Sequence, residues 1–167
     1  MVASWVAEVG RDRGPWVLEL VDLRDWSLPM DDEPEMPHHR AYTNAHTEAW
    51  SAKVAAADAV VFVTPQYNWG YPAALKNALD HLYSEWGGKP AMIVTYGGHA
   101  GDKCAAQLEQ VCLALHMQVV ATKPGFRLPR ERIEANTGQI SPKTEFAAHL
   151  LELQQAFKAL SAARTPV

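Results

Sequence analysis

Two short stretches combine residue types that suit the binding of a flat molecule with polar edges. The first runs from Pro65 to Pro72 (PQYNWGYP), and the second runs from Thr95 to Asp102 (TYGGHAGD). Aromatic side chains can pack against a planar ring, and the amide of Asn68 can both donate and accept hydrogen bonds. Glycines at 97, 98 and 101 let the backbone turn sharply and approach a ligand closely. A planar heteroaromatic ligand with carbonyl and imide edges matches these groups.

Both stretches stand between a predicted strand and a predicted helix. The apolar runs 59–64 and 90–96 read as strands, and residues 72–86 and 101–117 read as helices. In open α/β sheets, ligands bind beyond the carboxyl ends of the strands. Helix N-termini also offer unpaired N–H groups and the positive end of the helix dipole. We therefore expect residues 65–69 and 95–101 to lie side by side at one edge of a sheet.

The rest of the chain alternates in the same way. Further helices are predicted at 1–9, 44–58 and 141–163, further strands at 16–23 and 118–122, a loop at 29–41 and a long connection at 124–142. The strands are continuous apolar runs, as expected when both faces of a sheet are covered. This order predicts an α/β fold with a parallel sheet. With no repeat or low-complexity tract, residues 1–167 are expected to form a single domain.

Helical periodicity predicts the buried faces. Residues spaced three and four apart form one apolar stripe in the last helix, namely Phe146, Leu150, Leu153, Phe157 and Leu160. The helix at 101–117 carries a similar stripe, which includes Cys104 and Cys112. These two cysteines would lie about 12 Å apart along a helix, too far for a disulfide. They are expected to be core residues, as is Trp50.

Composition excludes several classes of protein. The apolar share is 48% and the charged share is 20%, which is typical of a globular chain. A net charge of −4 and a pI near 5.9 do not favour a nucleic-acid partner. No apolar run reaches the roughly 18 residues of a membrane helix, and a cytoplasmic location is expected. His38, His39 and His46 show no spacing typical of a metal site, so no metal is predicted.

Less specific interpretations remain open on spacing alone. GGHAG at 97–101 can be a plain turn between strand and helix, and the aromatics of Pro65–Pro72 can belong to the core. His99 can be an incidental loop residue or a catalytic base. No side chain is assigned as a catalytic acid or base. From these residues alone, the chain is a ligand-binding α/β domain.

A resemblance to a known family makes the hypothesis more specific. TPQYNWGYPAALKNALDHL resembles the P-E-Y-N-x-x-x-P-G-x-L-K-N-A-I-D signature of the NAD(P)H-dependent FMN reductases, a flavodoxin-like family that includes quinone, chromate and azo-dye reductases. VTYGGHAGDKCAAQLEQV is similar to the second flavin loop of that family, and the match runs from about Glu19 to about Val120. The resemblance implies a three-layer sandwich with strand order 2-1-3-4-5, FMN as cofactor and NAD(P)H as co-substrate. Electrons would pass to flavin, a quinone or a similar small acceptor.

The resemblance also implies a set of cofactor-binding residues. Pro65, Gln66, Tyr67 and Asn68, followed by Trp69, match the segment that lies along the isoalloxazine ring. Thr95, Tyr96, Gly97, Gly98 and His99, with Gly101 beyond them, match the loop that reaches the polar edge of the ring. Gln66 replaces the usual Glu and Ala73 the usual Gly. The helix at 72–86 matches one that packs against a second subunit, which implies a homodimer or homotetramer.

One departure concerns the beginning of the chain. Members of the family open with a strand and a phosphate-binding loop, whereas this sequence starts within the helix that follows them. We therefore expect weak FMN binding. We also expect either a displaced or abnormally paired strand at 16–23, or a gap in the sheet that is filled by a strand of another chain or by residues before Met1. An alternative function is a non-catalytic domain that keeps the fold. A flavodoxin-type electron carrier matches less well, because the loops have no dense acidic rim. The sequence does not identify the electron acceptor, and it does not distinguish NADH from NADPH as the co-substrate.

Overall fold

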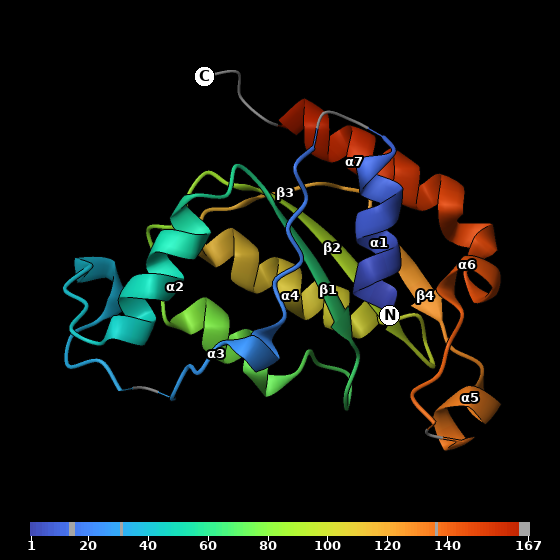
Figure 1. Cartoon of the computed structure of the whole chain (residues 1–167), viewed down its shortest axis with the longest axis horizontal. Helices are drawn as coiled ribbons and strands as arrows, with labels where there is room; N and C mark the ends of the chain where they lie inside the picture. Colours follow the sequence, from blue (N-terminus) through green and yellow to red (C-terminus); the bar gives the residue numbers. More distant parts are fainter. Residues whose placement is uncertain (14–15, 31, 136, 164–167) are drawn as a thin grey trace.

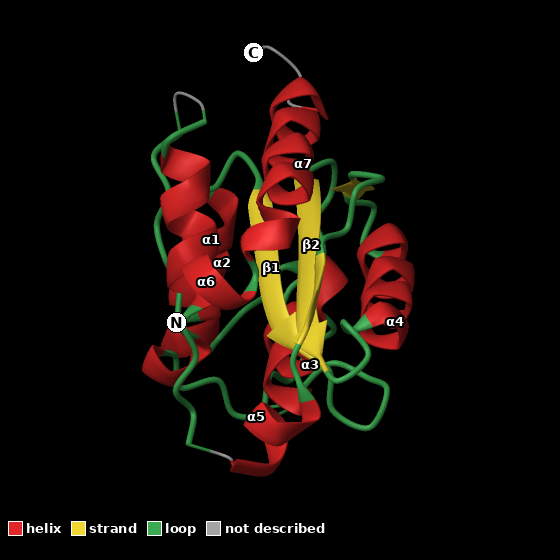
Figure 2. Ribbon diagram, turned by 90° about the vertical axis from the view of Figure 1, so that its right-hand side faces the viewer, coloured by secondary structure: helices red, strands yellow, loops and turns green. Residues whose placement is uncertain are grey.

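Parallel strands form the centre of the molecule. The computed structural model describes residues 1–13, 16–30, 32–135 and 137–163. In it, β1 (Val60–Pro65) pairs with β2 (Pro90–Gly97) along the whole of β1. Two short strands, β3 (Gln118–Val119) and β4 (Gly125–Arg127), pair in parallel with the start and the end of β2. Figure 2 shows β1 and β2 side by side with their arrows in the same direction. This arrangement agrees with strands 3, 4 and 5 of the flavodoxin order.

Helices cover both faces of this sheet (Figure 1). One helical layer contains α1 (Val2–Arg11) and α7 (Leu150–Ala163), and the other contains α2 (Ala45–Ala55), α3 (Ala73–Asp80) and α4 (Asp102–Ala114). Shorter elements are α5 (Arg130–Ala135), α6 (Pro142–Glu145) and single 3-10 turns at Leu23–Asp25, Pro37–His39 and Ala147–His149. The α/β class and the three layers predicted from the sequence are confirmed.

The side chains of β2 alternate between the two cores, because successive residues of a strand point to opposite faces. Ala91 and Ile93 pack with α2, α3 and α4, whereas Met92 and Val94 pack with α1 and α7. All four are fully buried. A strand that is buried on both faces explains the continuous apolar run that predicted it.

Most of the predicted buried faces are confirmed. The larger apolar residues of α1, together with Trp50, Cys104 and Cys112, are buried, and both cysteines are free thiols. In the last stripe, Phe146, Leu153, Phe157 and Leu160 are buried, but Leu150 is 38% exposed. Within the described residues, no helix has the length and hydropathy required to cross a membrane.

The predicted strand at 16–23 is wrong. Residues 16–22 have no regular structure, and Val17 is completely exposed while Trp16 and Leu18 pack against the core of α1 and α7. Within the described ranges, no strand pairs with the edge of β1 that faces away from β2. A strand needs a neighbouring strand to satisfy its backbone N–H and C=O groups. Apolar content alone therefore does not make residues 16–22 a strand.

The helix predicted at 72–86 ends at Asp80 instead. The last carbonyl groups of a helix lack the usual helical partners. Here two indoles bind such carbonyls, and the Leu79 carbonyl also accepts from the Leu82 N–H at 3.3 Å. Trp50 Nε1 donates to the Ala78 carbonyl at 2.8 Å, and Trp86 Nε1 donates to the Leu79 carbonyl at 3.0 Å. Residues 81–86 can therefore leave the helix at little cost, and Trp86 turns back into the core.

The C-terminal predictions need similar corrections. The helix predicted at 141–163 is divided into α6, a 3-10 turn and α7 around Phe146, whose ring stacks on Phe126 with centroids 4.9 Å apart. The strand predicted at 118–122 ends at Val119. The connection at 124–142, predicted without regular structure, contains β4 and α5.

Candidate functional site

The two predicted ligand loops meet at the carboxyl end of the sheet. β1 and β2 are parallel and in register, with Thr64 opposite Thr95 and Pro65 opposite Tyr96. The chain leaves both strands at the same level, so residues 65–69 and 95–101 lie side by side. The sequence-based expectation that these loops share one edge is confirmed.

Gln66 joins the two loops. Its backbone N–H donates to the Tyr96 carbonyl at 2.9 Å, and its side-chain Oε1 accepts from the backbone N–H of Cys104 at 3.1 Å, in the first turn of α4. Gly97 passes close to it, since a Cβ added at Gly97 would lie 3.4 Å from the Gln66 Cβ. Gln66 therefore fixes the second loop and the start of α4 relative to the first loop.

The first loop is a tight turn that exposes two aromatic rings. Tyr67 and Gly70 exchange two backbone hydrogen bonds of 2.9 Å, and Asn68 and Trp69 between them have φ values of 47° and 70°. Asn tolerates this left-handed conformation, whereas for a bulky residue such as Trp it is strained, at a cost of order 1–3 kcal/mol. Tyr67 and Trp69 are each 63% exposed. The alternative that these aromatics belong to the core is therefore wrong for Tyr67 and Trp69, whereas Tyr71 is partly buried and packs against the core.

The second loop turns sharply into α4. Gly101 is the N-cap of α4 with a φ of 80°, and the Thr95 hydroxyl donates to the Ala100 carbonyl at 2.9 Å. Among the residues that the structure describes, the backbone N–H groups of Gly98 and His99 have no hydrogen-bond partner. These N–H groups stand just before a helix N-terminus, where the helix dipole favours acceptors and anions.

Burial favours the neutral forms of two ionisable groups beside the loops. Burial raises the pKa of the Cys104 thiol to about 11, and burial also raises the pKa of Tyr96, with a smaller contribution from Tyr67. Lys103 supplies a positive charge, and its Nζ lies 5.8 Å from the centroid of the Trp69 ring. The edge therefore combines aromatic faces and backbone donors with two opposite charges, since the Asp102 carboxylate lies 3.8 Å from the Lys103 Nζ. The aromatic faces and donors suit a flat ring with polar edges.

The histidines are arranged differently from what their spacing suggests. The rings of His38 and His39 lie next to each other with centroids 3.8 Å apart and planes tilted by 39°, while His46 lies beside Asp32 and His81. Sequence reasoning missed this second group, because His46 and His81 are 35 positions apart and come together only through the packing of α2 on the end of α3.

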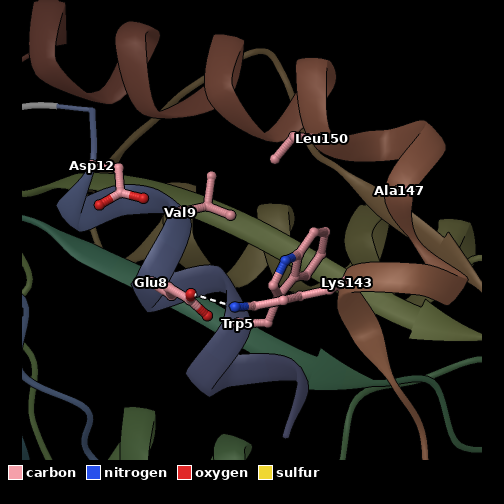
Figure 3. Close-up of a pocket in the computed structure, with 7 residues that line it drawn as sticks. All are labelled: Trp5, Glu8, Val9, Asp12, Lys143, Ala147 and Leu150. Carbon is pink, nitrogen blue, oxygen red and sulfur yellow. Dashed lines mark hydrogen bonds and ion pairs between the residues drawn. The ribbon is translucent and has the colours of Figure 1, made fainter.

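A shallow pocket lies in the other helical layer (Figure 3). It is lined by Trp5, Glu8, Val9 and Asp12 of α1 and its C-cap, together with Lys143, Ala147 and Leu150. Lys143 Nζ and Glu8 Oε1 form an ion pair of 2.6 Å across it. Its lining comes from α1, α6 and the segment leading into α7. The pocket is therefore separate from the two candidate ligand loops at residues 65–69 and 95–101, which we call the ring loops.

The fold is that of a flavodoxin-like α/β protein, with the two candidate ligand loops side by side at the strand ends. A model of the family "NADPH-dependent FMN reductase" matches residues 1–126. The chain belongs to that family of oxidoreductases, whose cofactor is FMN and whose co-substrate is NAD(P)H, which confirms the resemblance of the two loops.

Similar proteins agree with this assignment. The chain is 53% identical over 158 residues to an NAD(P)H-dependent FMN reductase of Schizosaccharomyces pombe, with 93% of this chain and 78% of that protein covered. It is 51% identical over 109 residues to an NAD(P)H-dependent FMN reductase of Saccharomyces cerevisiae, with 62% and 57% covered. A quinone reductase of Escherichia coli is 35% identical over 104 residues, with 58% and 55% covered. The chain thus spans little more than half the length of the last two relatives.

Solved structures support the fold. The flavoenzyme NAD(P)H:(acceptor) oxidoreductase FerB from Paracoccus denitrificans superposes with a TM-score of 0.68 at 22% identity, covering 99% of this chain and 92% of that one. At this level of identity the likeness concerns the fold alone.

Proposed function

We propose that this protein is an FMN-dependent NAD(P)H oxidoreductase that passes electrons to a small acceptor such as a quinone or free flavin. The observation that carries the proposal is the junction at Gln66, which holds residues 65–69 and 95–101 together at the strand ends. Membership of the family and the likeness to named FMN and quinone reductases support it.

The cofactor-binding residues are proposed from this geometry. The rings of Tyr67 and Trp69 offer apolar faces to the isoalloxazine, and the Asn68 amide offers hydrogen bonds to its edge. Pro65 and Gln66 place this turn, and Thr95, Tyr96, Gly97 and Gly101 shape the neighbouring loop. The unpaired N–H groups of Gly98 and His99 are available to the polar edge of the ring.

The protein's own contribution is positioning and electrostatics. When bound, FMN supplies hydride chemistry between NAD(P)H and the acceptor. Backbone N–H groups at residues 98–99, next to the N-terminus of α4, would stabilise negative charge at the edge of the ring. No side chain is assigned as acid or base. With its raised pKa, the Cys104 thiol stays protonated near neutral pH and is no nucleophile.

Asn68→Gly tests the ring site with little disturbance of the turn. Glycine adopts the observed φ of 47° freely, so the variant removes the amide and leaves the backbone path. Losing one hydrogen bond should weaken FMN binding by about 1–2 kcal/mol, or about 5- to 30-fold, measured by quenching of flavin fluorescence. Arg40→Gly is the matched control, since Arg40 has a similar φ of 54° in another loop. An FMN affinity equal in both variants would remove Asn68 from the site.

The alternative is a flavodoxin-like domain without catalysis. It is distinguished by two measurements on the purified chain, namely thermal stabilisation by FMN and oxidation of NADH or NADPH in the presence of FMN and a small quinone. The proposed enzyme gives both, whereas the non-catalytic domain gives no oxidation above the rate of free FMN.

Assembly and location complete the proposal. We propose a homodimer or homotetramer through residues 72–86, where Tyr83 is 37% exposed and donates or accepts a hydrogen bond with His116 at 3.2 Å. Trp86 is buried within its own chain and is not part of that surface. Light scattering that gives a monomer at tens of micromolar chain would contradict this.

The two free thiols suit a reducing compartment, so a cytoplasmic location is proposed, to be checked by cell fractionation. Neither a nucleic acid nor a membrane is proposed as a partner. Residues 1–167 are proposed to act as one domain, which a single cooperative unfolding transition would support.

A further inference from the structure

A second group of chemically capable side chains lies away from the ring loops. Asp32 comes from the loop before α2, His46 from the first turn of α2, and His81 from the C-cap of α3. One potential ligand atom of each lies within 4.8 Å of the other two. Three separate parts of the chain therefore bring two imidazoles and one carboxylate to the same point.

His81 is the buried member of this group. It is only 6% exposed, and its Nε2 lies 2.8 Å from the carbonyl oxygen of Pro29. Because a carbonyl oxygen only accepts, Nε2 must carry the proton, which leaves the lone pair of the neutral ring on Nδ1. Metal-binding histidines are commonly oriented in this way, by donating the second ring N–H to a backbone carbonyl.

Nδ1 of His81 has only a weak partner. The Thr47 hydroxyl lies 3.4 Å away, beyond the usual range for such a bond. The burial of a nitrogen lone pair without a good donor is costly, and a cation would offset that cost.

His46 and Asp32 supply the other two ligands. His46 Nε2 donates a hydrogen bond to the Asp32 carboxylate, with an oxygen 2.9 Å away, and a metal ion would take the place of that proton. The ring of His46 meets that of His81 edge-on, with centroids 5.9 Å apart. Both side chains are under a third exposed, so solvent can reach the group. Metal–ligand bonds of about 2.1 Å in a tetrahedral site require the ligand atoms to lie about 3.4 Å from one another. Rotation of the partly exposed His46 and Asp32 side chains can bring the three ligand atoms to that spacing.

We propose that Asp32, His46 and His81 form a binding site for a divalent transition-metal cation of the zinc type. Two imidazoles and one carboxylate are a ligand set that such a cation accepts, with a fourth position open to water. The cation would tie the loop at 29–41 to α2 and α3. This site is independent of the proposed flavin site, since none of its residues belongs to the ring loops.

Direct binding measurements test the proposal. The full chain is freed of metal with a chelator and titrated with Zn²⁺ against a chromogenic chelator. One Zn²⁺ per chain with micromolar or tighter affinity is expected, together with a rise in the unfolding temperature that depends on Zn²⁺ concentration. With Co²⁺, visible absorption bands of a four-coordinate site are expected.

Variants locate the site. Asp32→Asn combined with His46→Asn removes two ligands without touching buried His81, and should weaken Zn²⁺ at least about tenfold and abolish the cobalt bands. His38→Asn combined with His39→Asn is the matched control, because that adjacent pair of imidazoles is the competing surface site, and it should leave binding unchanged. The proposal is overturned if the wild-type chain binds only at millimolar Zn²⁺, or if Asp32→Asn/His46→Asn binds as tightly as the wild type.

Discussion

Replacing Gly101 by alanine should damage both stability and flavin binding. Gly101 has a φ of 80° and lies against the end of β2, where an added Cβ would come within 2.6 Å of the Thr95 Oγ1 and 3.2 Å of the Tyr96 backbone nitrogen. Thr95 cannot move away easily, because it is buried in the sheet and its hydroxyl holds the Ala100 carbonyl. The backbone of residues 97–101 must shift instead.

The size of the effect can be built from two contributions. A non-glycine residue in the left-handed region costs roughly 1–2 kcal/mol, and forcing an extra methyl into a packed site typically costs about 1–3 kcal/mol. Gly101→Ala should therefore lower the free energy of unfolding by about 2–5 kcal/mol. Gly88→Ala is the matched control, since Gly88 has a φ of 74° but no atom within 4 Å of the added Cβ. Gly88→Ala should therefore lose only the free energy that the left-handed backbone conformation costs, without the cost of crowding.

Urea unfolding of the wild type and both variants measures this difference. With an unchanged m-value, the two midpoints report stability directly. FMN affinity should fall in Gly101→Ala and stay unchanged in Gly88→Ala, because only Gly101 lies in a ring loop. Equal losses of unfolding free energy in the two variants would refute the crowding argument, and an unchanged FMN affinity in Gly101→Ala would refute the placement of the loop.

Three further outcomes follow from particular contacts. Gln66→Ala removes the acceptor for the Cys104 N–H and should cost about 0.5–2 kcal/mol, as loss of a helix cap does; Gln66→Glu keeps an acceptor and should lose less in the same urea assay. Burial raises the pKa of Glu33, but hydrogen bonds from Thr43, Thr47 and Asn44 outweigh it and lower that pKa to about 2. Its stabilisation is therefore complete above its ordinary pKa of 4.5 and is lost as the pH falls towards 2, so Glu33→Gln should lower stability at pH 6 and have little effect at pH 2. Buried Cys104 and Cys112 should react with a thiol reagent at neutral pH only after denaturation, and rapid labelling of the folded chain would contradict that.

The sequence by itself determined the elements whose signal is local. β2 is recognisable because a strand covered on both faces must be apolar throughout, and α1 and α4 are recognisable because each buries one face at helical spacing. The two ring loops follow from the same logic, since each separates a predicted strand from a predicted helix. Their adjacency needs only the rule that parallel strands end at the same edge.

Tertiary structure decided what depends on distant partners. Residues 16–22 have the apolar content of a strand but no neighbour to pair with among the described residues, and the three residues of β4 form a strand only because β2 is beside them. The end of α3 is set by the indoles of Trp50 and Trp86, which satisfy its last carbonyls.

Tertiary structure also decided the geometry of the proposed flavin site and of the proposed metal site. Trp69 has a left-handed backbone that its own preference disfavours, because the bonds between Tyr67 and Gly70 close the turn around it. His46 and His81 approach each other only when α2 packs against the end of α3. Contacts between residues far apart in the chain leave no periodicity in the sequence, so only the folded molecule reveals them.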